Sequence, residues 1–347
     1  MERIVDLRAY HAHRLGGHML DAMKNTKVGN ADYGEDPTVY KLQEIAAIKL
    51  GKESAIFIPS GTMGNLTAIM THTNGKGNEI IVGAQSHIYL NEVGGYASIS
   101  NVSVCLIPDD EGYLAPDKIE RAIRKSALTQ PRTALICLEN THNRAGGRVV
   151  RPDNFKAIRK LADKYNIPIH LDGERLFEAV VYLNIGVKEF TQYVDSVMIG
   201  LSKDLCCPVG SILAGKKSFI EKAWRNVKLL GGVMRQAGYI AAPGIIALEE
   251  MIDRLKEDQQ KAKKLASGLE KNSNIHLNLD KVETNIIKFG VRGNGWDAQR
   301  FCNEVRRKGI LCNAIDNFYV RMVIYCDISK SDIYYTLEQI KKVFREE

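Results

Sequence analysis

The sequence has 347 residues, more than one compact core usually contains, so we expect two domains. Hydrophobic residues make up 45% and charged residues 26%, as in an ordinary globular protein. The 48 Lys and Arg against 41 Asp and Glu leave a net charge of +7, but these charges are scattered and form no basic block with aromatic residues. A nucleic-acid-binding role is therefore disfavoured.

Seven cysteines, an odd number, follow no regular spacing and form no C-x-x-C motif. Most lie inside apolar runs, where free thiols pack as small hydrophobic groups. No stretch reaches the roughly 18 uninterrupted apolar residues that a membrane span requires. These features predict a reduced, cytoplasmic protein without a membrane segment.

The N-terminal residues 5–8 predict a short arm rather than a core element. His11, His13 and His18 follow closely and suggest a metal site, but no fixed pattern of carboxylates or cysteines accompanies them. We therefore expect polar loop residues and no metal. Apolar residues at helical spacing then predict a helix from about residue 38 to 50.

A candidate phosphate cradle follows the predicted strand 54–59. The turn Ser60-Gly61-Thr62-Met63-Gly64-Asn65 links this strand to a helix predicted from about Leu66. Small residues in such a turn expose backbone N–H groups, and the helix N-terminus adds positive potential. The turn lacks the lysine of a P-loop and the spacing of a dinucleotide fingerprint, which argues against ATP and NAD.

Three further strands are predicted at 79–83, 102–107 and 133–138, and a helix at 153–165. His87 lies just beyond the first of these strands. A histidine in this place can stack on a flat cofactor, move a proton, or simply bond to loop backbone. The alternation of strands and helices indicates a mostly parallel sheet covered on both faces.

Two apolar runs, 167–171 and 194–201, each end at polar residues. Asp172 follows the first run, and Ser202 and Lys203 follow the second. Ligands of open α/β sheets bind beyond the carboxyl ends of the strands. An acid there can hold the ring nitrogen of pyridoxal phosphate protonated, and an amine can form a Schiff base with its aldehyde. The pattern alone leaves a buried Asp–Lys ion pair open.

The last third changes in composition near residue 243. A strand at 208–214 and a helix at 217–230 precede one long predicted helix from about 245 to 271. Strand, helix, strand and helix are then predicted at 285–289, 296–308, 319–324 and 331–344. We therefore predict an N-terminal arm (1–20), a large cofactor-binding domain (21–243) and a small C-terminal α+β domain (244–347).

Eight segments together resemble the low-specificity L-threonine aldolases, which are pyridoxal phosphate enzymes of fold type I in the β-eliminating lyase superfamily. The segments are VDLR at 5–8, YGEDPT at 33–38, PSGTMGN at 59–65, SHI at 86–88, ENTHNRAGGRV at 139–149, HLDGERLF at 170–177, LSKDLCCPVGS at 201–211 and GGVMRQAG at 231–238. The resemblance runs nearly end to end. It implies an α/β fold with a large domain built on a mostly parallel sheet and a small C-terminal domain.

The resemblance implies pyridoxal 5'-phosphate as the cofactor. By this resemblance Lys203 is the Schiff-base lysine, Asp172 pairs with the ring nitrogen, and His87 stacks on the ring. The positions that match phosphate contacts are Gly61, Thr62 and Ser202, with Arg235 contributed from a neighbouring subunit.

The resemblance also implies the substrate and the assembly. Arg175 and Arg321 match the arginines that hold the substrate carboxylate, and Arg175 is also counted among the cofactor-binding positions. Tyr33 matches a loop that serves the partner's site. The expected protein is thus a homodimer with shared active sites, commonly paired into a homotetramer. The expected activity is cleavage of L-threonine or L-allo-threonine to glycine and acetaldehyde.

Four segments depart from the family pattern. Ala9-Tyr10-His11 replaces Ser-Asp-Thr, Glu174 replaces alanine, Asp204 replaces glycine, and Met322–Cys326 replaces a Val-Thr-His segment. We interpret all four as changes at the amino-acid end of the site. The alternative function is β-elimination, transaldol exchange or retro-aldol cleavage on a different amino acid. A cofactor-binding homologue without activity is disfavoured, because the catalytic positions are retained.

Overall fold

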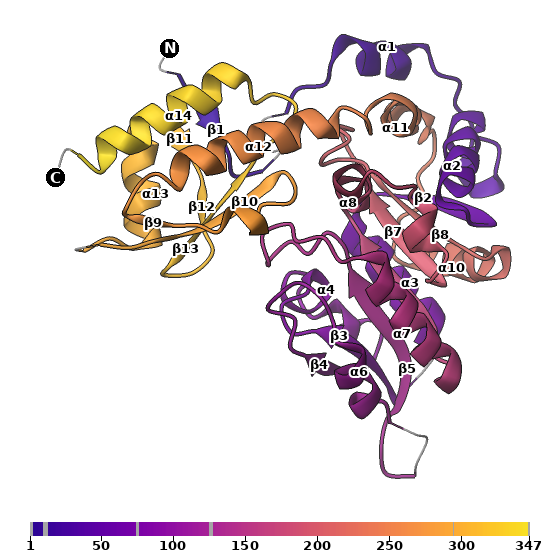
Figure 1. The fold of residues 1–347 in the computed structure, drawn as a ribbon. Helices are drawn as coiled ribbons and strands as arrows, with labels where there is room; N and C mark the ends of the chain where they lie inside the picture. The colour runs from indigo at the N-terminus through magenta and orange to yellow at the C-terminus, as the bar shows by residue number, and fades with distance from the viewer. Residues whose placement is uncertain (1–2, 10–12, 74–75, 125–127, 294, 346–347) are drawn as a thin grey trace. The chain divides into compact units, whose positions relative to one another are not determined.

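The computed structural model describes residues 3–9, 13–73, 76–124, 128–293 and 295–345 (Figure 1). The chain forms two compact units. The larger unit contains residues Leu15–Arg144 and Val150–Ile252, and the smaller unit contains Met1–Arg14, Ala145–Val149 and Asp253–Glu347. The predicted division into arm, large domain and small domain stays a prediction.

The larger unit is built on a seven-stranded sheet in the order β2-β8-β7-β6-β5-β3-β4. The strands are β2 (Ser54–Ile58), β3 (Asn78–Gly83), β4 (Ser103–Ile107), β5 (Arg132–Glu139), β6 (Ile169–Gly173), β7 (Ser196–Gly200) and β8 (Ser211–Gly215). β8 is antiparallel to both of its neighbours, β2 and β7, and the other neighbouring strands are parallel. The central strands are buried along their whole length, which explains their continuous apolar runs. The predicted mostly parallel α/β fold is confirmed.

The helices of the larger unit connect these strands. They are α1 (Gly17–Asn25), η1 (Ala31–Tyr33), α2 (Pro37–Leu50), α3 (Gly61–Thr73), α4 (His87–Leu90), α5 (Gly95–Ser98), α6 (Pro116–Ala122), α7 (Pro152–Tyr165), α8 (Leu176–Leu183), α9 (Lys188–Thr191), α10 (Lys217–Leu229) and α11 (Gly238–Glu250). The prediction that α3 begins near Leu66 is wrong. Ser60 Oγ accepts a hydrogen bond from the Met63 N–H at 3.3 Å, so the helix already begins at Gly61.

The smaller unit has a four-stranded antiparallel sheet in the order β12-β13-β10-β9 and a two-stranded pair, β1-β11. Its elements are β1 (Val5–Asp6), α12 (Leu255–Leu269), β9 (Ile275–His276), η2 (Leu279–Lys281), β10 (Ile286–Val291), α13 (Ala298–Arg307), β11 (Ile310–Leu311), β12 (Asn313–Ala314), β13 (Tyr319–Val323) and α14 (Lys330–Val343). Side chains of the three helices and both sheets form one core.

Two predictions for these elements differ from the structure. Residues 5–8 were expected outside the core, but Val5 and Leu7 are buried in the core of the smaller unit and β1 pairs with β11. The single long helix predicted for 245–271 is wrong, because the chain forms α11 and α12 with a break between them. The apolar spacing continues across that break, so periodicity could not reveal it. Among the described residues, no helix is both long and apolar enough to cross a membrane.

Candidate active site

Asp172 and Lys203 come from the ends of two adjacent parallel strands of the larger unit. Asp172 is the fourth residue of β6 and lies opposite Met198 of β7. Lys203 follows the end of β7 in a tight loop, where the Lys203 carbonyl accepts the Cys206 N–H and the Leu201 carbonyl accepts the Cys207 N–H, both at 3.0 Å. The strand-end placement predicted from the sequence is therefore present.

Asp172 is a buried carboxyl group with two donors. Its side chain is 2% exposed. Asn65 Nδ2 donates to Oδ2 at 2.9 Å, and the Glu174 N–H donates to Oδ1 at 3.1 Å. Burial, followed by the negative charge of Glu139, raises the pKa of Asp172 to about 7, although the nearby His87 opposes this shift. The carboxyl thus changes charge near neutral pH before any cofactor binds.

His87, the first residue of α4, is fixed by two carboxylates. Its backbone N–H donates to Glu139 at 2.7 Å, and its Nδ1 lies 2.9 Å from Glu92 Oε1. Burial lowers the pKa of the imidazole, but the hydrogen bond to Glu92 and the charge of Asp172 outweigh burial and raise it above the usual value. Because Glu92 can only accept when charged, Nδ1 is the donor and Nε2 is the nitrogen left for proton exchange.

The same region could also be considered as a cation site. Ligand atoms of His87, Glu92 and Asp172 lie within 4.8 Å of one another. However, Asn65 Nδ2 donates to both carboxylates, and His87 Nδ1 donates to Glu92. Some of the lone pairs that a metal would need are therefore used in hydrogen bonds, and the arrangement also fits a hydrogen-bonded acid–base group.

The predicted phosphate positions lie beside Lys203. Gly61 is the first residue of α3, and Thr62 at its second position is exposed. The first backbone N–H groups of an α-helix have no partner within the helix and favour anions. Ser202 is half-buried in the loop that carries Lys203. The α3 N-terminus and the lysine loop are connected through one side chain, that of Glu174.

Glu174 places its carboxylate between these elements. Oε1 lies 3.3 Å from Lys203 Nζ. A Cβ atom added to Gly61 would overlap Oε2 of Glu174, and one added to Gly200 would overlap Oε1. Two glycines, one on α3 and one on β7, thus make the room that this carboxylate occupies. The interpretation of Glu174 as a change at the amino-acid end stays a prediction, and its carboxylate lies against Lys203 and the first residue of α3.

Arg175, the next residue, precedes α8 and is 6% exposed. Its Nε lies 3.5 Å from Asp204 Oδ1, and Nη1 lies 3.5 Å from Asn143 Oδ1. Asp204 is also buried. The departure at Asp204 therefore puts a carboxylate on the arginine that is expected to hold the substrate carboxylate.

The remaining predicted site residues belong to other elements of the chain. Arg321 lies on β13 of the smaller unit, opposite Lys288 of β10. Tyr33 and Arg235 are exposed on the larger unit, with Tyr33 at 79%, and Arg235 Nε lies 3.9 Å from Asp32. Of the altered opening segment, Tyr10 and His11 lie outside the described residues. Residues 322–325 are buried in the core of the smaller unit.

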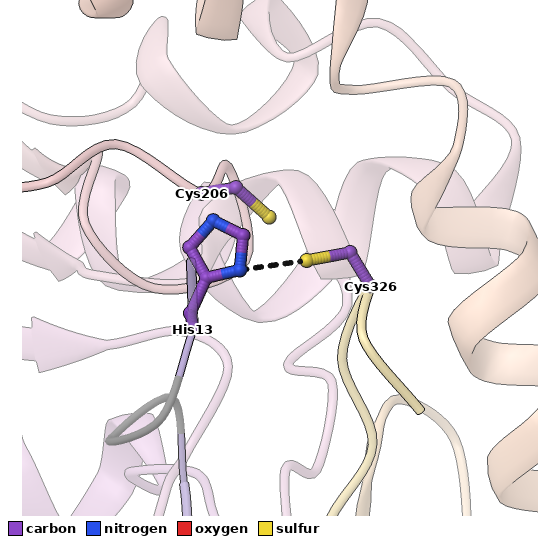
Figure 2. A group of neighbouring side chains, drawn as sticks. All are labelled: His13, Cys206 and Cys326. Atoms are coloured by element: carbon purple, nitrogen blue, oxygen red, sulfur yellow. Dashed lines mark hydrogen bonds between the residues drawn. The ribbon is translucent and has the colours of Figure 1, made fainter. Parts of the chain in front are cut away.

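His13 contacts the altered C-terminal segment within the smaller unit. Its Nδ1 lies 3.2 Å from Cys326 Sγ (Figure 2). The same nitrogen lies 3.0 Å from Asp327 Oδ2. The hydrogen bond to Cys326 raises the pKa of His13 to about 9, against the opposing effect of burial. His13 lies in a loop, as expected from the sequence, and is held there by Cys326 and Asp327. His18 lies on α1 of the larger unit, is exposed, and lies 3.2 Å from Glu250.

Comparison with solved structures identifies the class of this fold. The chain superposes on a threonine aldolase from Leishmania major with a TM-score of 0.83 and 18% identity, covering 97% of this chain and 99% of that one. It also superposes on the serine palmitoyltransferase of Sphingomonas wittichii with a TM-score of 0.77 and 15% identity, covering 99% and 88% of the two chains. The fold is that of the fold type I pyridoxal phosphate enzymes.

Comparison with curated sequences identifies the family. The beta-eliminating lyase family matches residues 6–291. Low-specificity L-threonine aldolase 1 of Arabidopsis thaliana is 40% identical over 339 residues, covering 96% of this chain and 95% of that protein. The low specificity L-threonine aldolase of Escherichia coli is 38% identical over 331 residues, covering 95% and 96%. The chain belongs to the beta-eliminating lyase family, within its low-specificity L-threonine aldolase group.

The residues present fit the family's cofactor, pyridoxal 5'-phosphate. A buried acid with a pKa near neutrality suits the ring nitrogen, a half-exposed lysine suits the aldehyde, and the open N-terminus of α3 suits the phosphate. Glu174 places a second carboxylate against Lys203 and the first residue of α3. The chain is a pyridoxal phosphate-dependent lyase.

Proposed function

We propose that this protein cleaves L-threonine or L-allo-threonine to glycine and acetaldehyde. The observation that carries the proposal is the placement of Asp172 and Lys203 at adjoining strand ends, with Arg175 following on the same connection. Relatives that are 38–40% identical, and that this chain matches over nearly their whole length, are named threonine aldolases. These names support threonine as the substrate.

The cofactor, when bound, accepts the electrons that are released as the bond between the α- and β-carbons breaks. We assign Lys203 to the covalent attachment of the cofactor and Asp172 to the proton on its ring nitrogen. Gly61, Thr62 and Ser202 are assigned to the phosphate.

Two further groups act on the amino acid itself. Arg175 holds the substrate carboxylate, and by resemblance Arg321 is the second arginine for the same group. A carboxylate fixed in this way aligns the breaking bond with the electron acceptor. His87, whose Nδ1 donates to Glu92, presents Nε2 for proton exchange with the β-hydroxyl.

The proposed assembly is a homodimer with shared active sites, paired into a homotetramer, in the cytoplasm. The exposure of Tyr33 and Arg235 on the larger unit supports a homodimer with shared active sites. An aromatic ring and a guanidinium that project from the surface can reach into a partner's site. Arg235 is assigned to the phosphate of the partner subunit, and Tyr33 to its substrate end.

A second candidate function is β-elimination, transaldol exchange or retro-aldol cleavage on another amino acid. The ion pair between Arg175 and Asp204 is the observation behind it, because Asp204 stands where the family pattern has glycine and contacts the arginine expected to hold the substrate. The two candidate functions are distinguished by identifying the reaction products, because rates alone do not separate them.

The experiment that tests the proposal is incubation of the cofactor-loaded protein with a panel of amino acids, followed by product identification. We expect equal amounts of glycine and acetaldehyde from L-threonine or L-allo-threonine. Release of ammonia and a 2-oxo acid from serine or cysteine derivatives, without aldehyde from either threonine, would favour the second candidate and exclude the first. Lys203→Ala serves as the background control.

Asp204→Gly is expected to lower KM for threonine about five- to tenfold with little change in kcat. Removing the competing carboxylate leaves Arg175 open to the substrate, and a charge-assisted hydrogen bond contributes about 1.5–3 kcal/mol before solvent and rearrangement reduce the gain. Threoninamide, which has no carboxylate, is the matched control substrate. An equal change for threonine and threoninamide would show that Asp204 does not act through the substrate carboxylate.

A further inference from the structure

A chain of polar side chains lies behind Asp172 in the larger unit. Asn65 and His72 belong to α3, His170 to β6 and Ser196 to β7. Asn65, His170 and Ser196 are each at most 1% exposed. The links measure 2.9 Å from Asp172 to Asn65, 3.0 Å from Asn65 to His170, 2.9 Å from His170 to Ser196, and 2.8 Å from Ser196 to His72.

The direction of these hydrogen bonds follows from the carboxylate end. Asn65 Nδ2 lies 2.9 Å from Asp172 Oδ2 and 2.8 Å from Glu92 Oε1. The amide nitrogen donates to both carboxyl groups, and both of its hydrogens are used. Asn65 Oδ1 therefore faces His170 Nε2, and this nitrogen must carry a hydrogen.

The two histidines complete the chain as neutral rings. Burial, with a smaller contribution from His72, lowers the pKa of His170 to about 3, and burial lowers that of His72 to about 4. A neutral His170 that donates from Nε2 must accept at Nδ1, so Ser196 donates its hydroxyl hydrogen. The Ser196 oxygen then accepts from His72 Nε2. Every donor in the chain points towards Asp172.

We propose that Asn65 and His170 are positioning residues, which hold Asp172 as an oriented, charged acceptor for the ring nitrogen of the cofactor. The proposal rests on the role of Asp172 given above. Hydrogen bonds in a buried chain polarise one another, so a one-way chain strengthens its last donor. Without that donor, Oδ2 would be buried with no partner, and the carboxyl would hold its proton instead of the ring.

The test uses the cofactor-loaded protein and four variants. Asn65→Leu removes the last donor, and His170→Leu removes the group that orients it. His170→Gln can place an amide N–H near the position of Nε2 and so keeps the donor to Asn65. Thr67→Val is the matched control, since Thr67 is equally buried on α3 and its hydroxyl has no hydrogen-bond partner among the described residues.

We expect the two leucine variants to lose about ten- to a hundredfold in kcat, with KM for the amino acid within about threefold of the wild type. His170→Gln and Thr67→Val should stay within about threefold of the wild type in kcat. One readout does not depend on turnover: in absorbance titrations of the cofactor-free proteins, the leucine variants should reach full cofactor affinity only at a higher pH than the wild type. The other readout is reconstitution with N-methyl pyridoxal phosphate, whose ring nitrogen carries a fixed positive charge. This analogue does not need a charged acid to hold a ring proton, so it should remove most of the difference between the leucine variants and the wild type.

The proposal is overturned if His170→Gln and His170→Leu lose activity equally, if Thr67→Val falls as far as Asn65→Leu, or if the N-methyl analogue leaves the difference unchanged. Should Asn65→Leu fail to fold, the His170 pair decides the question. Asp172→Asn distinguishes the role of Asp172 from the positioning role of Asn65 and His170. Normal turnover in this variant would contradict the role assigned to Asp172. Slow turnover in Asp172→Asn, with normal turnover in both leucine variants, would contradict only the positioning role of Asn65 and His170.

Discussion

Replacing Lys203 by alanine is expected to abolish the visible absorption band of the bound cofactor and to reduce cleavage at least about a thousandfold, equivalent to about 4 kcal/mol. The lysine nitrogen is the group at the end of β7 that can attach the aldehyde, and alanine offers no substitute. Absorption spectra of the purified variant, with and without added cofactor, check the first part, and aldehyde release checks the second.

The control for this loss is Lys222→Ala, which removes an exposed lysine from α10 of the same unit. It should keep both the band and the activity. Addition of a small primary amine such as methylamine should restore part of the lost rate in Lys203→Ala, because the amine can replace the missing nitrogen. An unchanged visible band in Lys203→Ala would remove Lys203 from the attachment role.

Asp172→Asn is expected to keep the cofactor bound but to lower kcat about 100- to 1000-fold, the range seen when one electrostatic group is removed from a preorganised site. An amide cannot stabilise the proton on the ring nitrogen, so the electron acceptor is weakened while the remaining contacts persist. Reconstitution with N-methyl pyridoxal phosphate should restore much of the loss. Near-normal turnover with the natural cofactor would contradict the assignment.

The affinity for the cofactor is expected to depend on pH in the wild type and not in Asp172→Asn. With its pKa near 7, Asp172 of the cofactor-free protein is charged above that pH and neutral below it. Affinity for the cofactor in the wild type should therefore rise between about pH 6 and pH 8. The asparagine variant cannot titrate at this position and should lack that rise, which equilibrium titrations followed by absorbance can measure.

The parts of the site that the sequence predicts are those set by local patterns. Asp172 and Lys203 could be placed at strand ends because each follows an apolar run, and adjoining parallel strands bring such ends together. The start of α3 was misplaced because glycine lowers helix propensity, and the Ser60 cap that outweighs it is a contact of specific geometry.

Residues whose role depends on distant contacts could not be singled out. Asn65 lies within a recognised segment, but its importance comes from bonds to Asp172 and His170, more than a hundred positions away. Glu92 likewise becomes part of the site only through His87 and Asn65. The contact of Glu174 with Lys203 and its fit against Gly61 and Gly200 could not be predicted either, since sequence does not determine the direction in which a side chain turns from its backbone.

The carboxylate of Glu174 makes three positions of this chain interdependent in their evolution. Shortening Glu174 demands nothing of its neighbours, whereas any side chain at Gly61 or Gly200 would meet its oxygens. A larger residue at Gly61 therefore requires the Glu174 carboxylate to move away or to be lost, and a larger residue at Gly200 also meets the backbone oxygen of Glu174. Substitutions at these positions are order-dependent, and sequences that combine Glu at 174 with a side chain at 61 or 200 should be rare among viable variants of this protein.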